Sequence, residues 1–239
     1  MLTGRGGLID GADAPAGMVR IAAGRFHMGD TRYYRDESPV HERSVDSFWL
    51  DRTPVTNRQF VSFVDETGYV TVAERALDPA EFPESTPDML QPGSLVFRRT
   101  AGPVNLQDWR QWWEWTTGAS WRAPEGPGSD LSDRWDHPVV QVSFDDAQAY
   151  AAWAGERLPT EGLGAFGGGT APAGSYPGGR TTLANVGGDG ESRRVLKGGS
   201  FLSSPDYCLR FRPAARSPHS HDTGASHIGF RCAMDAGAP

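Results

Sequence analysis

Most of the side chains that could do chemistry lie in one C-terminal block, residues 195–216, which reads VLKGGSFLSSPDYCLRFRPAAR. Cys208 follows Tyr207 and lies two residues before Arg210. Nucleophilic and metal-binding cysteines typically have basic neighbours, so Cys208 is a candidate nucleophile or metal ligand. A single cysteine is also often a small buried apolar side chain, and that interpretation stays open. Cys232, within the apolar segment IGFRCA, fits the buried interpretation better.

Histidines follow this block at positions 219, 221 and 227, with Asp222 between them. All four are metal-ligand residue types, and the H-x-H-D spacing can put two imidazoles on one face of a strand. Loops rich in Pro, Ser and Gly also carry exposed histidines that bind nothing, so a solvated loop is the alternative. The sequence has no G-x-S-x-G elbow, Walker loop, H-E-x-x-H motif or paired C-x-x-C.

Two helices are expected from their capping signals. Thr56 is followed three residues later by Gln59 and then by an amphipathic run that ends at Gly68, which predicts a helix opened by a capping box. Ser143 and Asp146 open a second apolar run in the same way. These helices are the firmest expectations for local structure.

Strands are expected on either side of the first helix. Residues 18–28 alternate apolar and polar side chains around Gly24, which predicts a hairpin pair of strands. The segments 45–51 (VDSFWLD) and 139–144 (VVQVSF) predict two further strands.

The middle of the chain has no sustained helical or strand period. Residues 77–138 contain tryptophans at positions 109, 112, 113, 115, 121 and 135. Aromatic rings bury a large area at low entropic cost, so they predict a satellite core under an irregular loop. The functional alternative is the floor of a groove for a peptide. Residues 161–200 are rich in glycine and predict either a flexible linker or a series of tight turns.

Length and charge limit the function classes. The 239 residues predict a loose N-terminal tail, residues 1–17, and one domain, residues 18–239. A net charge of -7 disfavours a nucleic-acid partner, because phosphate neutralisation needs a basic surface. There is no apolar run long enough for a membrane span and no signal-peptide pattern, so we expect a cytoplasmic protein without a membrane partner. Two cysteines are too few for a disulfide scaffold.

Four blocks, taken in order, resemble one family over nearly the whole chain. They are MVRIAAGRFHMGD, ESPVHERSVDSFWLDRTPVTNRQFVSFVDETGYVTVAER, WRAPEGPGSDLSDRWDHPVVQVSFDDAQAYAAWAGERLPTE and KGGSFLSSPDYCLRFRPAARSPHSHDTGASHIGFRCA. The sequence is similar to the formylglycine-generating enzymes, the sulfatase-modifying factor family. This resemblance implies a variant C-type-lectin-like α+β fold with little regular secondary structure.

The resemblance also implies an activity. Family members use O2 and copper(I) to oxidise the cysteine of a C-x-P-x-R segment in a sulfatase to formylglycine, and two cysteines hold the copper. In the family pattern K-G-G-S-x-x-C-x-x-x-x-C, the serine corresponds to Ser200, the first cysteine to Ser203 and the second cysteine to Cys208. The implied catalytic and metal residues are therefore Cys208 and Ser203, with Ser200 as a polar partner. The implied contacts to the peptide are Arg210, Trp112, Trp113 and Tyr207, in a monomeric protein.

The sequence departs from the family pattern at its most sensitive position. Copper(I) is soft and prefers thiolates, so the hydroxyl of Ser203 should remove most of the affinity for the metal. Either a deliberate Cys-to-Ser change or a natural loss of catalysis would account for it. Residues 161–197 are also shorter than in the family, and only Asn185 and Val186 remain of a calcium-binding segment. Calcium is therefore a doubtful cofactor, since it needs six to eight oxygen donors.

Other functions remain as alternatives. The same scaffold serves noncatalytic peptide-binding or ligand-binding homologues, which would bind without turnover. A weaker alternative assigns the three histidines to an iron site of the kind found in related ergothioneine-pathway sulfoxide synthases. Whether Cys208 pairs with Cys232 is left open by the sequence.

Overall fold

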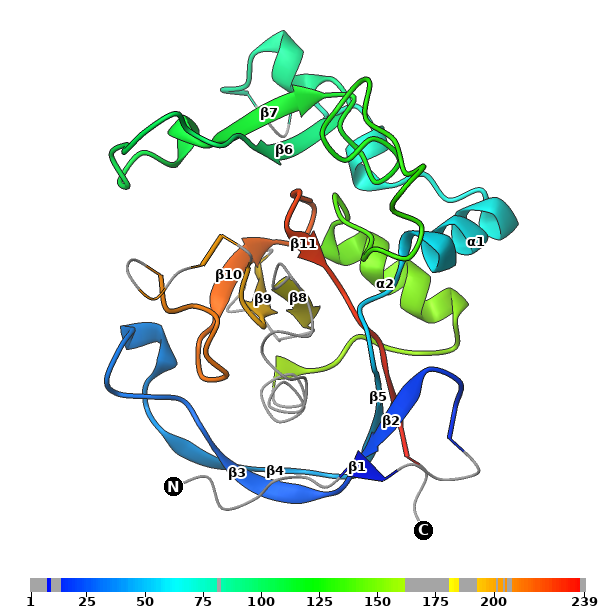
Figure 1. Ribbon diagram of the computed structural model, residues 1–239, viewed down its shortest axis with the longest axis vertical. Coiled ribbons are helices and arrows are strands. Elements are labelled where there is room, and N and C mark those ends of the chain that lie inside the picture. The colour runs from blue at the N-terminus through cyan, green and yellow to red at the C-terminus, as the bar shows by residue number, and fades with distance from the viewer. Residues whose placement is uncertain are drawn as a thin grey trace.

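The computed structural model describes residues 8–9, 14–80, 83–161, 181–184, 193–200, 202–203, 205 and 208–236. Figure 1 shows short elements joined by long irregular segments. The helices are α1 (Asn57–Thr67) and α2 (Phe144–Trp153), with short 3-10 helices η1 (Arg35–Glu37), η2 (Val72–Glu74), η3 (Pro87–Leu90) and η4 (Trp109–Gln111). The strands are β1 (Leu8–Ile9), β2 (Met18–Ile21), β3 (Gly24–Met28), β4 (His41–Val45), β5 (Phe48–Asp51), β6 (Gly93–Phe97), β7 (Trp113–Thr117), β8 (Thr181–Ala184), β9 (Arg193–Lys197), β10 (Ser217–Ser220), β11 (Ile228–Gly229) and β12 (Ala233–Asp235).

Within these residues the strands form four small sheets. One sheet has the order β1-β2-β5-β12 and another the order β10-β9-β8-β11, while β3-β4 and β6-β7 are two-stranded. The β3-β4 ribbon and the β6-β7 ribbon lie at opposite ends of the long axis of the molecule, with the β10-β9-β8-β11 sheet and helices α1 and α2 between them (Figure 1). The predicted α+β fold of low regular content is confirmed.

The capping box of α1 forms as predicted. The Thr56 hydroxyl accepts from the Gln59 amide at 3.3 Å, and the Gln59 side chain accepts from the Thr56 amide at 2.9 Å. Gly68 ends the helix in the left-handed region with φ 68°, where a glycine has no steric penalty. Local polar signals therefore set both ends of this helix.

The predicted cap of α2 is also confirmed, and the Asp146 side chain makes further hydrogen bonds outside the helix. Ser143 is the N-cap and accepts from the Asp146 amide at 3.1 Å. One oxygen of the buried Asp146 carboxyl accepts from the Tyr69 hydroxyl at 3.1 Å and from the Val72 amide at 3.0 Å. Burial raises the pKa of Asp146. Asp146 thus joins α2 to the segment that follows α1.

An aromatic cluster joins the two helices to the C-terminal segment. The Phe60 ring lies 5.9 Å from Tyr150 of α2, 5.1 Å from Trp121 and 6.3 Å from Phe230, between ring centres. Phe60, Trp121 and Phe230 have no exposed surface. This cluster is the centre of the main hydrophobic core.

The predicted hairpin over residues 18–28 is wrong. Both strands exist, but β2 pairs with β5 and β3 pairs with β4. Two-residue hairpin turns need positive φ angles, and the linking residues Ala22 and Ala23 do not supply them. The predicted strand over residues 45–51 is likewise divided between the end of β4 and β5.

The predicted strand over residues 139–144 is also wrong. Val139, Val140 and Val142 are buried as a strand would require, but their backbone bonds go to separate segments. The Val139 amide donates to Val55 at 2.9 Å and the Gln141 amide to Ala225 at 3.2 Å. Gln141 has φ 61°, which interrupts an extended strand.

The tryptophan-rich middle contains a hairpin that its sequence pattern does not predict. Strands β6 and β7 pair from Gly93 opposite Thr117 to Phe97 opposite Trp113. Strand β1 lies within the predicted N-terminal tail and pairs with β2, and the domain boundary at residue 18 stays a prediction. Among the described residues, neither helix is long and apolar enough to cross a membrane.

Replacing Thr56 by Ala should destabilise the protein by about 1 kcal/mol, because the Gln59 amide loses its acceptor at the start of α1. The matched control is Thr86→Ala, since Thr86 is the N-cap of η3 without a side-chain cap bond. Urea unfolding midpoints give both values. Equal losses from the two substitutions would show that the capping bond does not stabilise the fold.

Candidate functional site

The candidate site begins in the turn that follows β9. The Ser200 carbonyl accepts from the Ser203 amide at 3.0 Å, and its hydroxyl accepts from the Leu202 amide at 3.1 Å. Gly199, with φ 78°, precedes this turn, and a Cβ there would lie 2.5 Å from the Cα of Phe211. Only a glycine fits this close approach.

The turn brings together the two residues that the resemblance implies as metal ligands. The Ser203 Oγ lies 3.7 Å from the Cys208 Sγ, and both residues are partly exposed. One neutral hydroxyl and one thiol are therefore the donors offered here. Because copper(I) is held by soft sulfur ligands, this donor pair does not fit that ion.

A buried lysine fixes the segment between Cys208 and β10. Lys197 ends β9, and its ammonium donates to the carbonyls of Pro213 and Ala215, each at 2.8 Å. Only 5% of Lys197 is exposed, and this burial lowers its pKa to about 8. Lys197 is the only lysine in the sequence.

Arg210 has partners within the protein. Its guanidinium donates to Asp36 at 2.6 Å and to the Arg216 carbonyl, and it lies 4.0 Å above the Tyr34 ring. The Tyr34 hydroxyl in turn accepts from the Leu209 amide at 3.1 Å. Arg210 therefore ties the loop after Cys208 to η1, and its contact with a peptide stays a prediction.

Arg212 makes a more deeply buried connection to the same region. Its guanidinium pairs with Glu37 at 2.5 Å and with Asp30 at 3.5 Å, and it lies 3.8 Å above the Tyr33 ring. The Glu37 side chain has no exposed surface. Hydrogen bonds from Arg32 lower the pKa of Asp30. The loop is thus held by fixed ionic partners.

The predicted peptide contacts on the hairpin lie in different surroundings. Trp113 packs against the core, 5.8 Å from the Phe97 ring and 4.8 Å from the His227 ring, between ring centres. Trp112 is partly exposed directly after η4. Tyr207 lies outside the described residues, as do Asn185 and Val186 of the doubtful calcium segment. A groove formed by these residues stays a prediction.

The three histidines point to separate partners. His219 bonds to the Thr223 carbonyl at 2.9 Å and His221 to the Asp145 carboxyl at 2.8 Å, while the His227 ring packs at a tilt of 40° against Trp113. Burial lowers the pKa of His219. These histidines do not form a metal-ligand group among the described residues.

The structure also contains a group of possible metal ligands around Cys232, which the sequence patterns do not predict. One donor atom each from Asp51, Glu156 and Cys232 lies within 4.8 Å of the others. Burial raises the pKa of Asp51 to about 7 and also raises the pKa values of Glu156 and the Cys232 thiol. Cys208 and Cys232 are both free, which answers the pairing question that the sequence leaves open.

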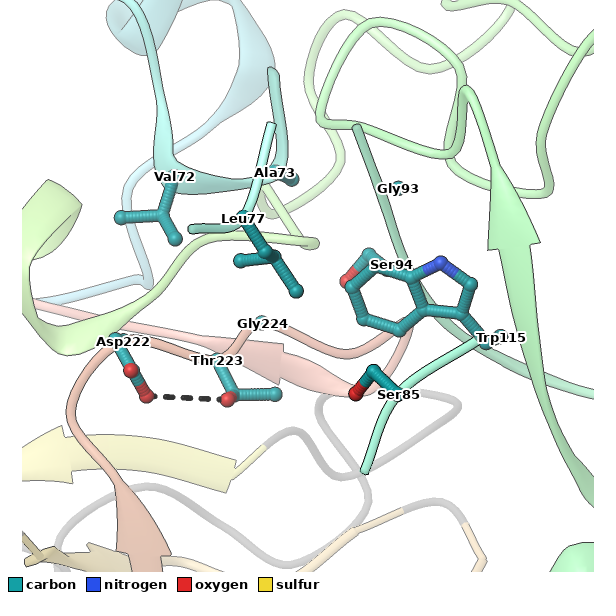
Figure 2. Close-up of a pocket in the computed structure, with 10 residues that line it drawn as sticks. All are labelled: Val72, Ala73, Leu77, Ser85, Gly93, Ser94, Trp115, Asp222, Thr223 and Gly224. Atoms are coloured by element: carbon teal, nitrogen blue, oxygen red, sulfur yellow. Dashed lines mark hydrogen bonds between the residues drawn. The ribbon is translucent and has the colours of Figure 1, made fainter. Parts of the chain in front are cut away.

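A pocket of about 600 Å³, including its open mouth, is lined in part by the β6-β7 hairpin. Figure 2 shows Asp222 and Trp115 on opposite sides of it. Its lining residues are Val72, Ala73, Leu77, Ser85, Gly93, Ser94, Trp115, Asp222, Thr223 and Gly224. None belongs to the loop of residues 198–216, so the pocket is separate from the Ser203–Cys208 pair.

The buried lysine gives a pH-dependent expectation. The pKa of Lys197 is about 8 in the folded protein and 10.5 in its reference state, so between these values the unfolded chain binds more protons. Stability should rise over this window, by up to about 3 kcal/mol, and Lys197→Met should lack this rise. Urea midpoints at intervals from pH 7 to pH 10 measure it. An equal rise in the variant would contradict the assignment.

Comparisons with known proteins identify the family. The family model described as "Sulfatase-modifying factor enzyme 1-like domain" matches residues 9–188 and 173–236. A formylglycine-generating enzyme of Mycobacterium tuberculosis is 41% identical over 291 residues, covering 91% of this chain and 97% of that protein. Because this span exceeds the 239 residues of the chain, the relative carries segments that have no counterpart here.

Other relatives differ in activity. A mouse protein named "Inactive C-alpha-formylglycine-generating enzyme 2" is 31% identical, covering 95% of this chain and 88% of that protein. A hercynine oxygenase of Mycolicibacterium smegmatis is 32% identical, covering 60% of this chain and 29% of that protein.

A solved structure supports the fold. PvdO from Pseudomonas aeruginosa has a TM-score of 0.60 at 17% identity and covers 98% of this chain and 99% of that chain. On the family model and the identities above, the chain belongs to the sulfatase-modifying factor family, with the formylglycine-generating enzymes.

Proposed function

We propose that this chain is a formylglycine-generating-enzyme-type protein that binds a C-x-P-x-R sulfatase peptide but is impaired as a copper-dependent, O2-using oxidase. The observation that carries the proposal is the 3.7 Å separation of the Ser203 hydroxyl and the Cys208 thiol. The hydroxyl stands at the position where the family pattern has its first cysteine. The proposal therefore assigns the impairment to the donor set.

In this proposal Cys208 is the remaining thiol and Ser203 the changed ligand position. Ser200 keeps the turn that sets their separation through its two hydrogen bonds to Ser203 and Leu202. Arg210 is held by Asp36, so its charge has a fixed place beside the loop. With Trp112, Trp113 and Tyr207 it would contact an extended peptide.

Copper(I) would supply oxidation chemistry in a family member with two thiolates. This chain offers one thiol and one neutral hydroxyl, which is a weak donor for a soft ion. We therefore derive no reaction step through copper for the chain as it stands. The role that the proposal leaves to its own residues is to position a peptide cysteine beside the Cys208 thiol.

Replacing Ser203 by Cys should restore the missing function. The variant should bind copper(I) at least about 100-fold more tightly than the parent, since loss of even an outer partner costs about 10–100-fold in metal affinity. It should also convert a C-x-P-x-R peptide. Copper(I) competition titration and mass spectrometry of the peptide measure the two effects.

The control for this experiment is the double variant Ser203→Cys, Cys208→Ser, which again has one thiol and one hydroxyl. It should lose both gains, because the number of thiols and not the position of one thiol decides binding. If Ser203→Cys neither binds copper(I) nor converts the peptide, the impaired-enzyme proposal is wrong.

A noncatalytic binding protein is the second candidate. The observation in its favour is the relative named as inactive, which matches 95% of this chain. In that case the parent should bind the C-x-P-x-R peptide equally well with and without copper(I), and Ser203→Cys should add no turnover. Peptide titration followed by tryptophan fluorescence tests this. Absence of peptide binding under both conditions would exclude the candidate.

A further inference from the structure

Donor groups from three separate elements meet around Cys232. Asp51 is the last residue of β5, Glu156 lies in the turn after α2, and Cys232 directly precedes β12. A carboxylate oxygen from each acid and the Cys232 Sγ all lie within 4.8 Å of one another. Cys232 has no exposed surface and the two acids are partly buried. These donors are therefore shielded from bulk water, unlike an exposed acidic patch.

The backbone holds these three positions independently of any ligand. The Asp51 amide donates to the Cys232 carbonyl at 3.0 Å, and the Cys232 amide donates to an Asp51 carboxylate oxygen at 2.7 Å. Arg157, next to Glu156, exchanges two backbone bonds with Ala233, at 3.0 and 2.8 Å. These bonds thus hold the three segments that carry the donors next to one another.

Two arginines lie beside this trio. Arg231 donates to the main-chain oxygen of Asp51 at 3.5 Å, and Arg157 pairs with the Asp235 carboxylate. The positive charge of Arg231 favours the ionised Asp51 carboxyl, but burial outweighs it and raises the pKa of Asp51 to about 7. Three acidic groups that converge in a partly buried place repel one another when ionised, and a divalent cation among them would remove this repulsion.

We propose that Asp51, Glu156 and Cys232 bind a divalent metal ion of the zinc class. One thiolate and two carboxylates are ligands that zinc accepts, and three protein ligands leave a fourth position for water. With metal–sulfur and metal–oxygen bonds of about 2.0–2.3 Å, tetrahedral ligands lie about 3.5 Å apart. Because the donors lie within 4.8 Å of one another, no pair would have to close by more than about 1.3 Å. The Cys232 thiol loses its proton to solvent when the metal binds.

This site is distinct from the Ser203–Cys208 pair in place and in chemistry. It offers one sulfur and two oxygens, which suit a borderline ion better than copper(I). The bound ion would cross-link β5, the turn after α2 and the C-terminal strand. Its consequence would be a more stable fold, independent of any peptide-directed activity.

Cobalt(II) is the probe that tests this site, because a thiolate bound to it gives a charge-transfer band in the near ultraviolet. Titration of the reduced, metal-free full-length chain should produce this band, and zinc(II) should then abolish it. The band should survive in Cys208→Ala and disappear in Cys232→Ser. With only two cysteines in the sequence, this pair of variants identifies the sulfur.

A second variant guards against failure of Cys232→Ser to fold. Glu156 is only partly buried, so Glu156→Gln should keep the circular dichroism spectrum of the parent. This variant should weaken cobalt(II) binding by more than about tenfold. Asp235→Asn, a nearby acid outside the trio, should leave the affinity unchanged. No band in the parent, a band lost in Cys208→Ala, or equal affinities for Glu156→Gln and the parent would each overturn the proposal.

Discussion

The buried contact between Arg212 and Glu37 is the constraint on which the candidate site depends. Glu37 has no exposed side-chain surface, and Arg212 reaches it across 175 residues of sequence. Removing one partner of such a pair typically costs about 3–5 kcal/mol, because the other charge stays buried without compensation. In a chain with few long helices or strands, contacts of this kind replace regular hydrogen-bond ladders in fixing loops. The planar guanidinium suits the task, which is consistent with a sequence that has one lysine among its 23 basic residues.

This constraint separates the architecture of the site from its chemistry. The turn at Ser200, the ammonium of Lys197 and the guanidinium of Arg210 each hold the loop without using the Ser203 side chain. A thiol at position 203 would therefore enter a loop whose supports do not depend on it. Under the proposed function, a single substitution would therefore impair the copper chemistry that the family resemblance implies while the fold of the family is kept.

Capping chemistry is local, and for this reason both helices are predictable from sequence: Thr56 with Gln59 and Ser143 with Asp146 lie three residues apart. The proximity of Ser203 and Cys208 is also local, and the family pattern specifies it. Strand partners are not predictable in this way, because β2 pairs with β5 through long-range packing that the alternation of residues 18–28 does not encode. The group around Cys232 cannot be predicted from the sequence for the same reason, since Asp51 and Cys232 are separated by 181 residues.

The two cysteines show how surroundings decide the use of one residue type. Cys208 lies partly exposed beside a hydroxyl, whereas Cys232 is fully buried beside two carboxyls. The sequence contains no third thiol. Since copper(I) is held by paired soft donors, and Cys232 belongs to a separate buried group, the unaltered chain has no second thiol to place beside Cys208. A two-thiolate site at this loop must therefore take its second thiolate from a substituted residue or from a bound molecule.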